Sequence, residues 1–130
     1  MRVVLDTNIL VSACWKPDGL EAQVVELATS GRIAACLSTE IIAEYRDVFT
    51  RKKLAAVTDH AFVILAALEQ SAVIVEPETR ATGSIDEDDN RFLECAEAAG
   101  ADFLITGNLR HYPEVWGNTR MVNARAFLSR

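Results

Sequence analysis

The chain has 130 residues, of which 50% are hydrophobic, and this is enough apolar material for the core of one domain spanning residues 1–130. Its 13 basic and 19 acidic residues give a formal net charge of −6, which argues against a generally basic nucleic-acid-binding surface. A nucleic-acid substrate would therefore have to be held by a local group of basic residues or through a metal ion.

Strands alternate with helices along the whole chain. Apolar runs, helical spacing and capping residues predict, in chain order, a strand at 3–5, helices at 8–14 and 20–30, a strand at 32–37, helices at 40–49 and 59–70, a strand at 73–75, a helix at 88–99, strands at 103–105 and 121–122, and a helix at 124–128. Proline and glycine make 76–87 and 110–118 irregular.

This alternation predicts an α/β fold with a parallel sheet between helical layers. In such sheets the functional site lies beyond the carboxyl ends of the strands. Asp6 follows the first predicted strand directly, and Thr106 follows the fourth. Both residues are therefore expected at the same edge of the sheet.

Asp6 has two interpretations. It follows the apolar run Val3-Val4-Leu5, where a folding argument alone would not choose an acid. Aspartate is also a preferred N-cap of a helix, and a helix is predicted to start here. The residue is therefore either a cap or part of a site.

Glu44 borders the apolar face of the helix predicted at 40–49. Glu40 and Asp47 point away from that face, whereas Glu44 lies between Ile41 and Val48. A functional role is favoured, and the alternative is a boundary residue that reaches solvent or pairs with a base.

Asp89 is the acid whose position is hardest to explain by folding. It lies three positions before Phe92 and seven before Ala96, on the apolar face of the helix predicted at 88–99. An acid in the first turn of a helix is stabilised by the helix dipole, with Asp86 as the cap. That explanation does not account for an inward-facing carboxylate, so we predict a site.

Asp6, Glu44 and Asp89 together predict a divalent-metal site. Clustered carboxylates repel one another, and a hard cation such as Mg²⁺ relieves the repulsion. Such an ion assists phosphodiester hydrolysis. His60 and His111 are isolated in the sequence and are given no catalytic role.

No apolar run approaches the ~20 residues of a membrane span, and the chain starts directly with a predicted strand. Three cysteines, Cys14, Cys36 and Cys95, are far apart and do not resemble a disulfide framework or a zinc site. A cytoplasmic protein without a membrane partner is expected.

Four segments resemble the PIN-domain family of nucleases. They are Val3-Val4-Leu5-Asp6-Thr7-Asn8, the stretch from Thr39 to Tyr45, the stretch from Asp86 to Ala96, and the stretch from Gly100 to Asn108. The resemblance covers nearly the whole chain and is greatest to the VapC-like bacterial branch of toxin–antitoxin toxins. It implies a three-layer α/β/α fold with a central five-stranded parallel sheet, and Mg²⁺- or Mn²⁺-dependent cleavage of RNA.

The resemblance also implies roles for individual residues. Asp6, Glu44 and Asp89 match the metal-binding catalytic acids, and Asn8 and Thr106 match supporting polar residues. The family often has a fourth acid where this chain has Asn108, so Asn108 is expected as a neutral or water-mediated ligand. An antitoxin protein and a homodimer are implied as partners.

Two other functions compete with a metal-dependent ribonuclease. A haloacid-dehalogenase-type phosphatase also begins with a strand and an aspartate, but it needs an acid where this chain has Asn8. Alternatively, the chain is an RNA- or protein-binding module whose catalysis is weakened by Asn108.

Surface interactions leave further alternatives open. Trp15 and Trp116 are expected either at an interface or buried against the sheet. Two groups are either RNA contacts or solvated surface: Arg46, Arg51, Lys52 and Lys53, and then Arg110, His111 and Tyr112.

Overall fold

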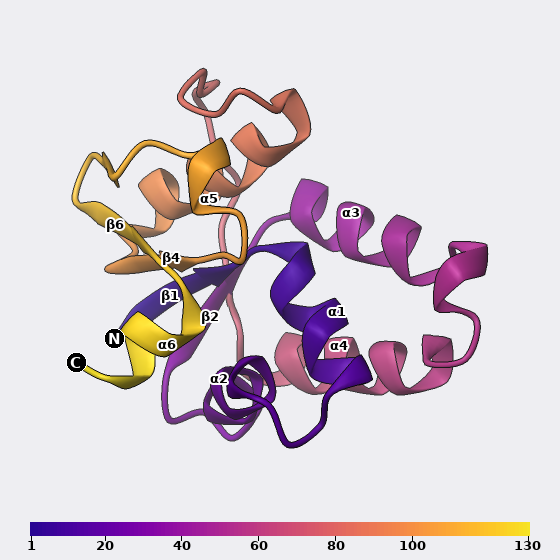
Figure 1. The fold of residues 1–130 in the computed structure, drawn as a ribbon. Coiled ribbons are helices and arrows are strands. Elements are labelled where there is room, and N and C mark those ends of the chain that lie inside the picture. Colours follow the sequence, from indigo (N-terminus) through magenta and orange to yellow (C-terminus); the bar gives the residue numbers. More distant parts are fainter.

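A computed structural model describes all residues from 1 to 130. Its elements alternate as the sequence predicts (Figure 1). They are β1 (Arg2–Leu5), α1 (Thr7–Trp15), α2 (Leu20–Thr29), β2 (Ala34–Leu37), α3 (Thr39–Phe49), η1 (Lys52–Leu54), α4 (Thr58–Ser71), β3 (Val73–Ile74), η2 (Glu87–Asp89), α5 (Asn90–Ala99), β4 (Phe103–Ile105), η3 (Leu109–His111), β5 (Val115–Trp116), β6 (Thr119–Val122) and α6 (Ala124–Leu128), where η marks a 3₁₀ turn.

One six-stranded sheet forms the centre of the fold, in the order β3-β2-β1-β4-β6-β5. The first five strands in this order run parallel, and β5 pairs antiparallel with β6 at one edge. The predicted parallel sheet is confirmed. The count of five strands is corrected to six, because β5 lies within the segment 110–118 that was expected to be irregular.

The added strand β5 belongs to a tight hairpin. Gly117 and Asn118 are the two residues between β5 and β6, and Gly117 has a φ of 58°. Glycine at the first position of a two-residue hairpin loop suits a type II′ turn. The pair Gly117-Asn118 is therefore a sequence signal for this hairpin. It was not recognised, because the whole segment 110–118 was predicted to be irregular.

Helices cover both faces of the sheet. Helix α5 packs on β1, β2 and β4 from one face, whereas α1, α2 and α4 pack together on the other face with α6 beside α2 (Figure 1). The predicted three-layer α/β/α architecture is confirmed. Helix α3 contacts α1, α4 and α5 and lies beyond the ends of the strands, where it can reach a site at the carboxyl edge.

Capping signals set several helix boundaries. The Ser38 hydroxyl accepts a hydrogen bond from the backbone N–H of Ile41 at 3.2 Å and caps the start of α3. Gly100 ends α5 in the left-handed conformation, with a φ of 61°. The start of α5 is corrected from 88 to Asn90, because Asp89 belongs to the 3₁₀ turn η2 and occupies the N-cap position.

Aromatic packing fixes α3 to the rest of the core. The Tyr45 ring lies 6.2 Å from the rings of Phe49 and Phe92, and all three side chains are buried. The Tyr45 hydroxyl donates a hydrogen bond of 2.5 Å to the carbonyl of Leu5, the last residue of β1. Tyr45 therefore ties α3, next to Glu44, to the strand end that carries Asp6.

Tyr45→Phe is expected to lower the free energy of unfolding by about 1–2 kcal/mol, because the buried Leu5 carbonyl loses its side-chain donor while the ring packing remains. Urea unfolding of both proteins measures the difference. An unchanged unfolding midpoint would show that the hydroxyl does not stabilise the fold.

The two ends of the chain lie side by side at the edge where β1 begins (Figure 1). The Arg130 guanidinium lies 2.9 Å from the Met1 sulfur. Asp6 lies at the opposite end of β1. The three cysteines are free and buried, as predicted, and none of the helices is long and apolar enough to cross a membrane.

Candidate metal centre

Asp6 lies where β1 ends and α1 begins. Its backbone N–H donates a hydrogen bond to the carbonyl of Ile105 at 3.0 Å, which extends the pairing of β1 with β4 by one residue. The residue is only 4% exposed, and although it occupies the N-cap position of α1, its carboxylate makes no capping hydrogen bond. The cap interpretation therefore has no hydrogen bond to support it.

Three side chains donate hydrogen bonds to the same oxygen of Asp6, Oδ2. The donors are the Thr106 hydroxyl at 2.7 Å, the Tyr112 hydroxyl at 3.1 Å and the Asn8 amide at 3.2 Å. Burial raises the pKa of Asp6, and these hydrogen bonds oppose that rise. The other oxygen, Oδ1, accepts none of these three side-chain hydrogen bonds.

Asn8 and Thr106 each connect Asp6 to the loop after β4. The Asn8 side-chain oxygen accepts a hydrogen bond from the Gly107 N–H at 2.9 Å. The Thr106 hydroxyl accepts one from the Asn108 N–H, also at 2.9 Å. A side chain at Gly107 would begin 3.3 Å from the Asn8 oxygen, so glycine allows this close approach. The two predicted supporting residues thus lie beside Asp6.

Glu44 projects from α3 and is half-buried. Burial and then repulsion from Asp88 raise the pKa of its carboxyl. Glu44 borders the buried side of α3, between Ile41 and Val48, as its helical position predicts.

Asp89 is half-buried, unlike Asp86, Glu87 and Asp88 before it, which are exposed. Burial first, and then repulsion from Asp6 and Asp86, raise the pKa of Asp89 to about 6, although a contact with His111 opposes the rise. A carboxyl group that is hard to ionise in the protein alone gains most from a nearby cation.

One cavity of about 330 Å³ brings the predicted site residues together. Its polar lining includes Asp6, Asn8, Glu44, Asp89 and Asn108. Thr106 is fully buried and reaches the cavity only through its hydrogen bond to Asp6. Residues separated by up to about a hundred positions in the sequence therefore meet, although their role as metal ligands stays a prediction.

The tightest group of metal-binding atoms differs from the predicted three acids. One ligand atom each from Asp86, Asp89 and His111 lies within 4.8 Å of the other two. Asp6, Glu44 and Asp89 form no group this tight. Because Mg²⁺ retains several waters, the three acids could share such an ion partly through water.

Two basic side chains border the same cavity. Arg51 and Lys53 belong to the basic group predicted at 46–53, and both line the cavity beside the acids. Arg51 also forms an ion pair of 3.0 Å with Asp47. Arg46 instead pairs with Glu69 at 3.4 Å on the solvent side. Only part of the basic group is therefore placed to meet a phosphate in the cavity.

Two residues that contact the acids were predicted only as RNA contacts or solvated surface. Tyr112 was assigned to an RNA contact or surface, yet it is buried and bonded to Asp6; burial and that carboxylate raise its pKa, so it remains a donor. His111 was given no catalytic role, yet its Nδ1 lies 3.4 Å from Asp89 Oδ2. Their position just after the fourth strand was the available signal.

Glu94 is a buried acid that the sequence did not single out. Its carboxylate contacts Arg80 at 3.1 Å and Arg91 at 2.9 Å, and it accepts a hydrogen bond from the Ala81 N–H at 2.9 Å. Because both charges and the backbone are paired, Glu94 fastens the segment before η2 to α5 and is not free to bind an ion.

The two tryptophans have different surroundings. Trp15 is 48% exposed at the end of α1, whereas Trp116 is half-buried and lies beside Gly83 at the border of the core. The interface interpretation stays open for Trp15, and Trp116 is partly buried at the edge of the sheet.

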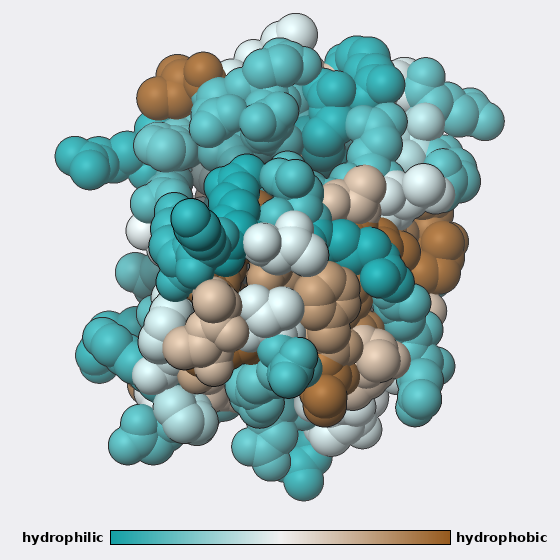
Figure 2. Space-filling view, turned by 90° about the vertical axis from the view of Figure 1, so that its right-hand side faces the viewer, coloured by the Kyte–Doolittle hydropathy of each residue, from teal (hydrophilic) through white to brown (hydrophobic).

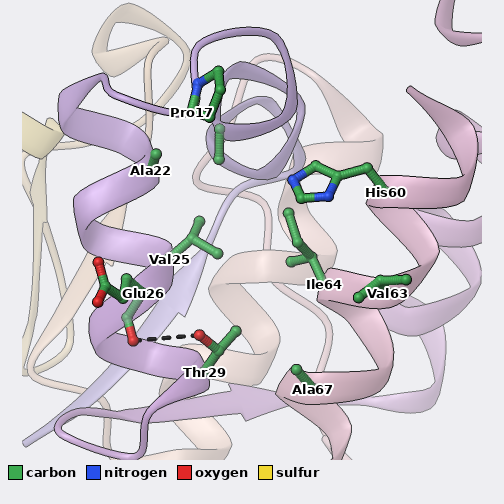
Figure 3. Close-up of a pocket in the computed structure, with 10 residues that line it drawn as sticks. Pro17, Ala22, Val25, Glu26, Thr29, His60, Val63, Ile64 and Ala67 are labelled. Carbon is green, nitrogen blue, oxygen red and sulfur yellow. Dashed lines mark hydrogen bonds between the residues drawn. The ribbon is translucent and has the colours of Figure 1, made fainter. Parts of the chain in front are cut away.

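A separate cavity of about 350 Å³ lies between α2 and α4 (Figure 3). Val25 and Ile64 point into it from facing helices, and His60 lies at its rim. Glu26 is its only acid, and none of the predicted site residues lines it. This apolar hollow therefore does not offer the chemistry of a metal centre.

The surface beyond the carboxyl end of β1 is mixed in polarity. Figure 2 shows mainly hydrophilic residues over its upper half and a group of apolar residues below.

Fold and cavity together define a class of protein, namely a small α/β/α domain with carboxylates at the carboxyl end of a parallel sheet. The sequence matches the PIN-domain family model over residues 2–110. It is 31% identical, over 111 residues, to the uncharacterized protein MJ1680 of Methanocaldococcus jannaschii, and the match covers 83% of this chain and 71% of that protein. The chain belongs to the PIN-domain family.

Solved structures share the fold at low sequence identity. The DNA-bound VapBC2 of Rickettsia felis superposes with a TM-score of 0.62 at 20% identity, covering 95% of this chain and 98% of that one. The DNA-bound VapBC of Salmonella typhimurium gives 0.62 at 15% identity, with the same coverage. FitAB bound to the IR36 DNA fragment gives 0.60 at 15% identity, covering 94% of each chain.

Proposed function

We propose that residues 1–130 form a divalent-metal-dependent endoribonuclease that acts as the toxin of a toxin–antitoxin pair. The observation that carries the proposal is the single cavity lined by Asp6, Glu44 and Asp89 in a PIN-family chain. Phosphatase chemistry is set aside, since Asn8 is engaged by Asp6 and Gly107 and the chain belongs to another family.

The residues of the cavity suit a hard divalent cation. Asp6 is a buried acid whose Oδ1 accepts none of the three side-chain hydrogen bonds, and no basic side chain forms an ion pair with it. Asp6, Glu44 and Asp89 would hold Mg²⁺ or Mn²⁺, with Asn108 as a neutral oxygen donor. When bound, such an ion supplies positive charge that makes a water more acidic and polarises a phosphoryl oxygen.

The side chains around the acids prepare the site. Thr106, Tyr112 and Asn8 hold one Asp6 oxygen and thereby orient the other. Arg51 and Lys53 would bind RNA phosphates at the rim and offset the repulsion between RNA and the acidic cavity.

The partners of the nuclease belong to the same proposal. Two solved structures with this fold are DNA-bound VapBC complexes, which supports an antitoxin protein as a partner. The PIN-domain resemblance implies a homodimer. A cytoplasmic location is expected because the three cysteines do not resemble a disulfide framework. Both expectations remain parts of the proposal.

The purified protein is expected to cleave single-stranded RNA with Mg²⁺ or Mn²⁺ and to stop when EDTA removes the metal. Glu44→Gln should slow cleavage about a hundredfold or more, because it removes a charge that attracts the ion. Glu26→Gln, at the separate apolar cavity, is the matched control and should cleave normally. Denaturing gels measure the rates. Metal-independent cleavage, or an active Glu44→Gln variant, would contradict the proposal.

One observation favours a second function. Asn108 lines the cavity at the position where the PIN-domain resemblance implies an acid, so the site has less negative charge for a metal. The alternative is a PIN-fold RNA- or protein-binding module with weakened catalysis. RNA binding without metal-dependent cleavage would support it.

A further inference from the structure

Asp86, Asp89 and His111 form a group of ligands that the proposed nuclease site does not require. They come from η2, the turn before it and η3, and one ligand atom of each lies within 4.8 Å of the other two. We propose that these three side chains bind a divalent transition-metal ion. Asp89 is the one residue that this site shares with the proposed nuclease site, and the inference rests on the proposed function only through Asp89.

The ligand atoms are accessible and lightly engaged. His111 Nδ1 lies 3.4 Å from Asp89 Oδ2, and the two side chains are 39% and 16% exposed. No other side chain bonds to the Asp89 carboxylate. The exposed Asp86 uses Oδ1 to accept a hydrogen bond from the Asp88 N–H at 3.0 Å, which leaves Oδ2 free. An ion bound here would therefore replace only the 3.4 Å contact between His111 and Asp89, and it would break no buried hydrogen bonds.

A second set of hydrogen bonds holds the backbones of the ligands in place. The Ser84 hydroxyl donates to the carbonyl of His111 at 2.6 Å and accepts from the N–H of Asp86 at 3.2 Å. The Ser84 N–H in turn donates to the buried Asn90 side chain at 2.8 Å. One serine thus couples the loop of His111 to the loop of Asp86, as a prepared ligand set requires.

The 3₁₀ turn η3 brings the imidazole to this position. The N–H of His111 donates to the carbonyl of Asn108 at 2.9 Å, which closes one turn between the two residues. Three residues after Asn108 the chain therefore presents an imidazole nitrogen to Asp89. A nitrogen ligand among carboxylate oxygens affects which ion the site prefers.

Imidazole nitrogen suits Zn²⁺, Co²⁺ and similar ions, whereas Mg²⁺ prefers oxygen ligands and octahedral geometry. Three protein ligands leave a position for water or a phosphate oxygen. Because Asp89 also lines the acidic cavity, an ion bound here would lie beside the proposed cleavage site.

The two histidines allow a direct test. Zn²⁺ is titrated into the metal-free ¹⁵N-labelled protein while the imidazole nitrogens of His60 and His111 are followed by NMR. The His111 nitrogens should shift on binding, and those of His60, which lies at the separate apolar cavity, should not. Unchanged His111 resonances at saturating Zn²⁺ would overturn the site without the need for any variant.

Calorimetry with variants gives an independent measure. His111→Ala and Asp86→Asn should each weaken Zn²⁺ binding about tenfold or more, and His60→Ala should leave it unchanged. Mg²⁺ affinity should be nearly the same in His111→Ala and in the wild type. Equal Zn²⁺ affinity of His111→Ala and the wild type would contradict the proposal, as would an equal loss for both ions.

The nuclease proposal can fail separately. A protein that binds Zn²⁺ through His111 but cleaves no RNA with any metal would retain this site and lose the proposed activity. If the protein cleaves RNA with Mg²⁺ but the His111 resonances do not shift with Zn²⁺, the nuclease proposal is supported and the Zn²⁺ site is contradicted.

Discussion

Asp89→Asn is expected to reduce RNA cleavage about a hundredfold or more and, at the same time, to stabilise the metal-free protein. The variant keeps the shape of the side chain and removes a charge that attracts the ion. Denaturing gels of RNA cleavage with Mg²⁺ measure the first effect. Cleavage at the wild-type rate would remove Asp89 from the mechanism.

The gain in stability follows from the pKa of Asp89. Its folded-state value of about 6 lies above the ordinary value of 3.8, so the folded protein binds this proton more tightly than the unfolded chain. The protonated Asp89 carboxyl therefore contributes to the free energy of unfolding below about pH 4, and this contribution is lost as the pH rises through about 6. At pH 8 the ionised carboxylate costs stability, and asparagine removes that cost.

Urea unfolding in EDTA should show Asp89→Asn to be more stable than the wild type by about 1–3 kcal/mol at pH 8. The difference should shrink at pH 5, where the wild-type carboxyl is largely protonated. A variant less stable than the wild type at pH 8 would show that hydrogen bonding of the carboxylate outweighs its repulsion from Asp6 and Asp86.

Asn108→Asp is expected to raise Mg²⁺ affinity about tenfold, because it adds a carboxylate to a cavity that already contains Asp6, Glu44 and Asp89. Without metal, the added repulsion should lower the free energy of unfolding by about 1 kcal/mol. Calorimetry with Mg²⁺ and urea unfolding in EDTA measure the two effects.

Asn123→Asp is the matched control for this substitution. Asn123 lines a neighbouring hollow with Asn108, and its side-chain oxygen caps α6, a role that aspartate also fills. It should not change Mg²⁺ affinity. If Asn108→Asp turns an inactive protein into an active nuclease, the wild type is the binding module. Unchanged Mg²⁺ affinity would place residue 108 outside the metal centre.

Local sequence signals predicted most of the fold. The apolar run Val3-Val4-Leu5, the Ser38 cap and Gly100 each act through their own neighbours, and each marks the predicted element. Strand β5 was missed because Pro113 and Gly117 flank it and made the segment 110–118 resemble a loop.

The site was less predictable because carboxylates at similar positions can serve opposite purposes. Asp89 is the N-cap of α5 and Glu94 lies within this helix, and both side chains are at least half-buried. Glu94 is the more buried, but Arg80 and Arg91 neutralise it. Helical spacing shows where an acid points and says nothing about which basic residues from other segments reach it.

Contacts across the chain were beyond sequence reasoning for the same reason. Tyr45 reaches Leu5, and Tyr112 reaches Asp6, through distances in sequence of 40 and 106 positions. Their hydroxyl groups fix the geometry around Asp6. The position of Tyr112 after the fourth strand indicates the edge of the sheet, but the sequence around either tyrosine does not identify the residue that it contacts.

The neighbouring positions of Met1 and Arg130 have a practical consequence. Any segment joined before Met1 or after Arg130 would leave the molecule from the edge opposite Asp6. A fluorescent label or a surface tether attached there would lie at the edge of the sheet opposite Asp6. The cavity lined by the acids would then face the solution. Immobilised protein should therefore remain open to metal ions and RNA.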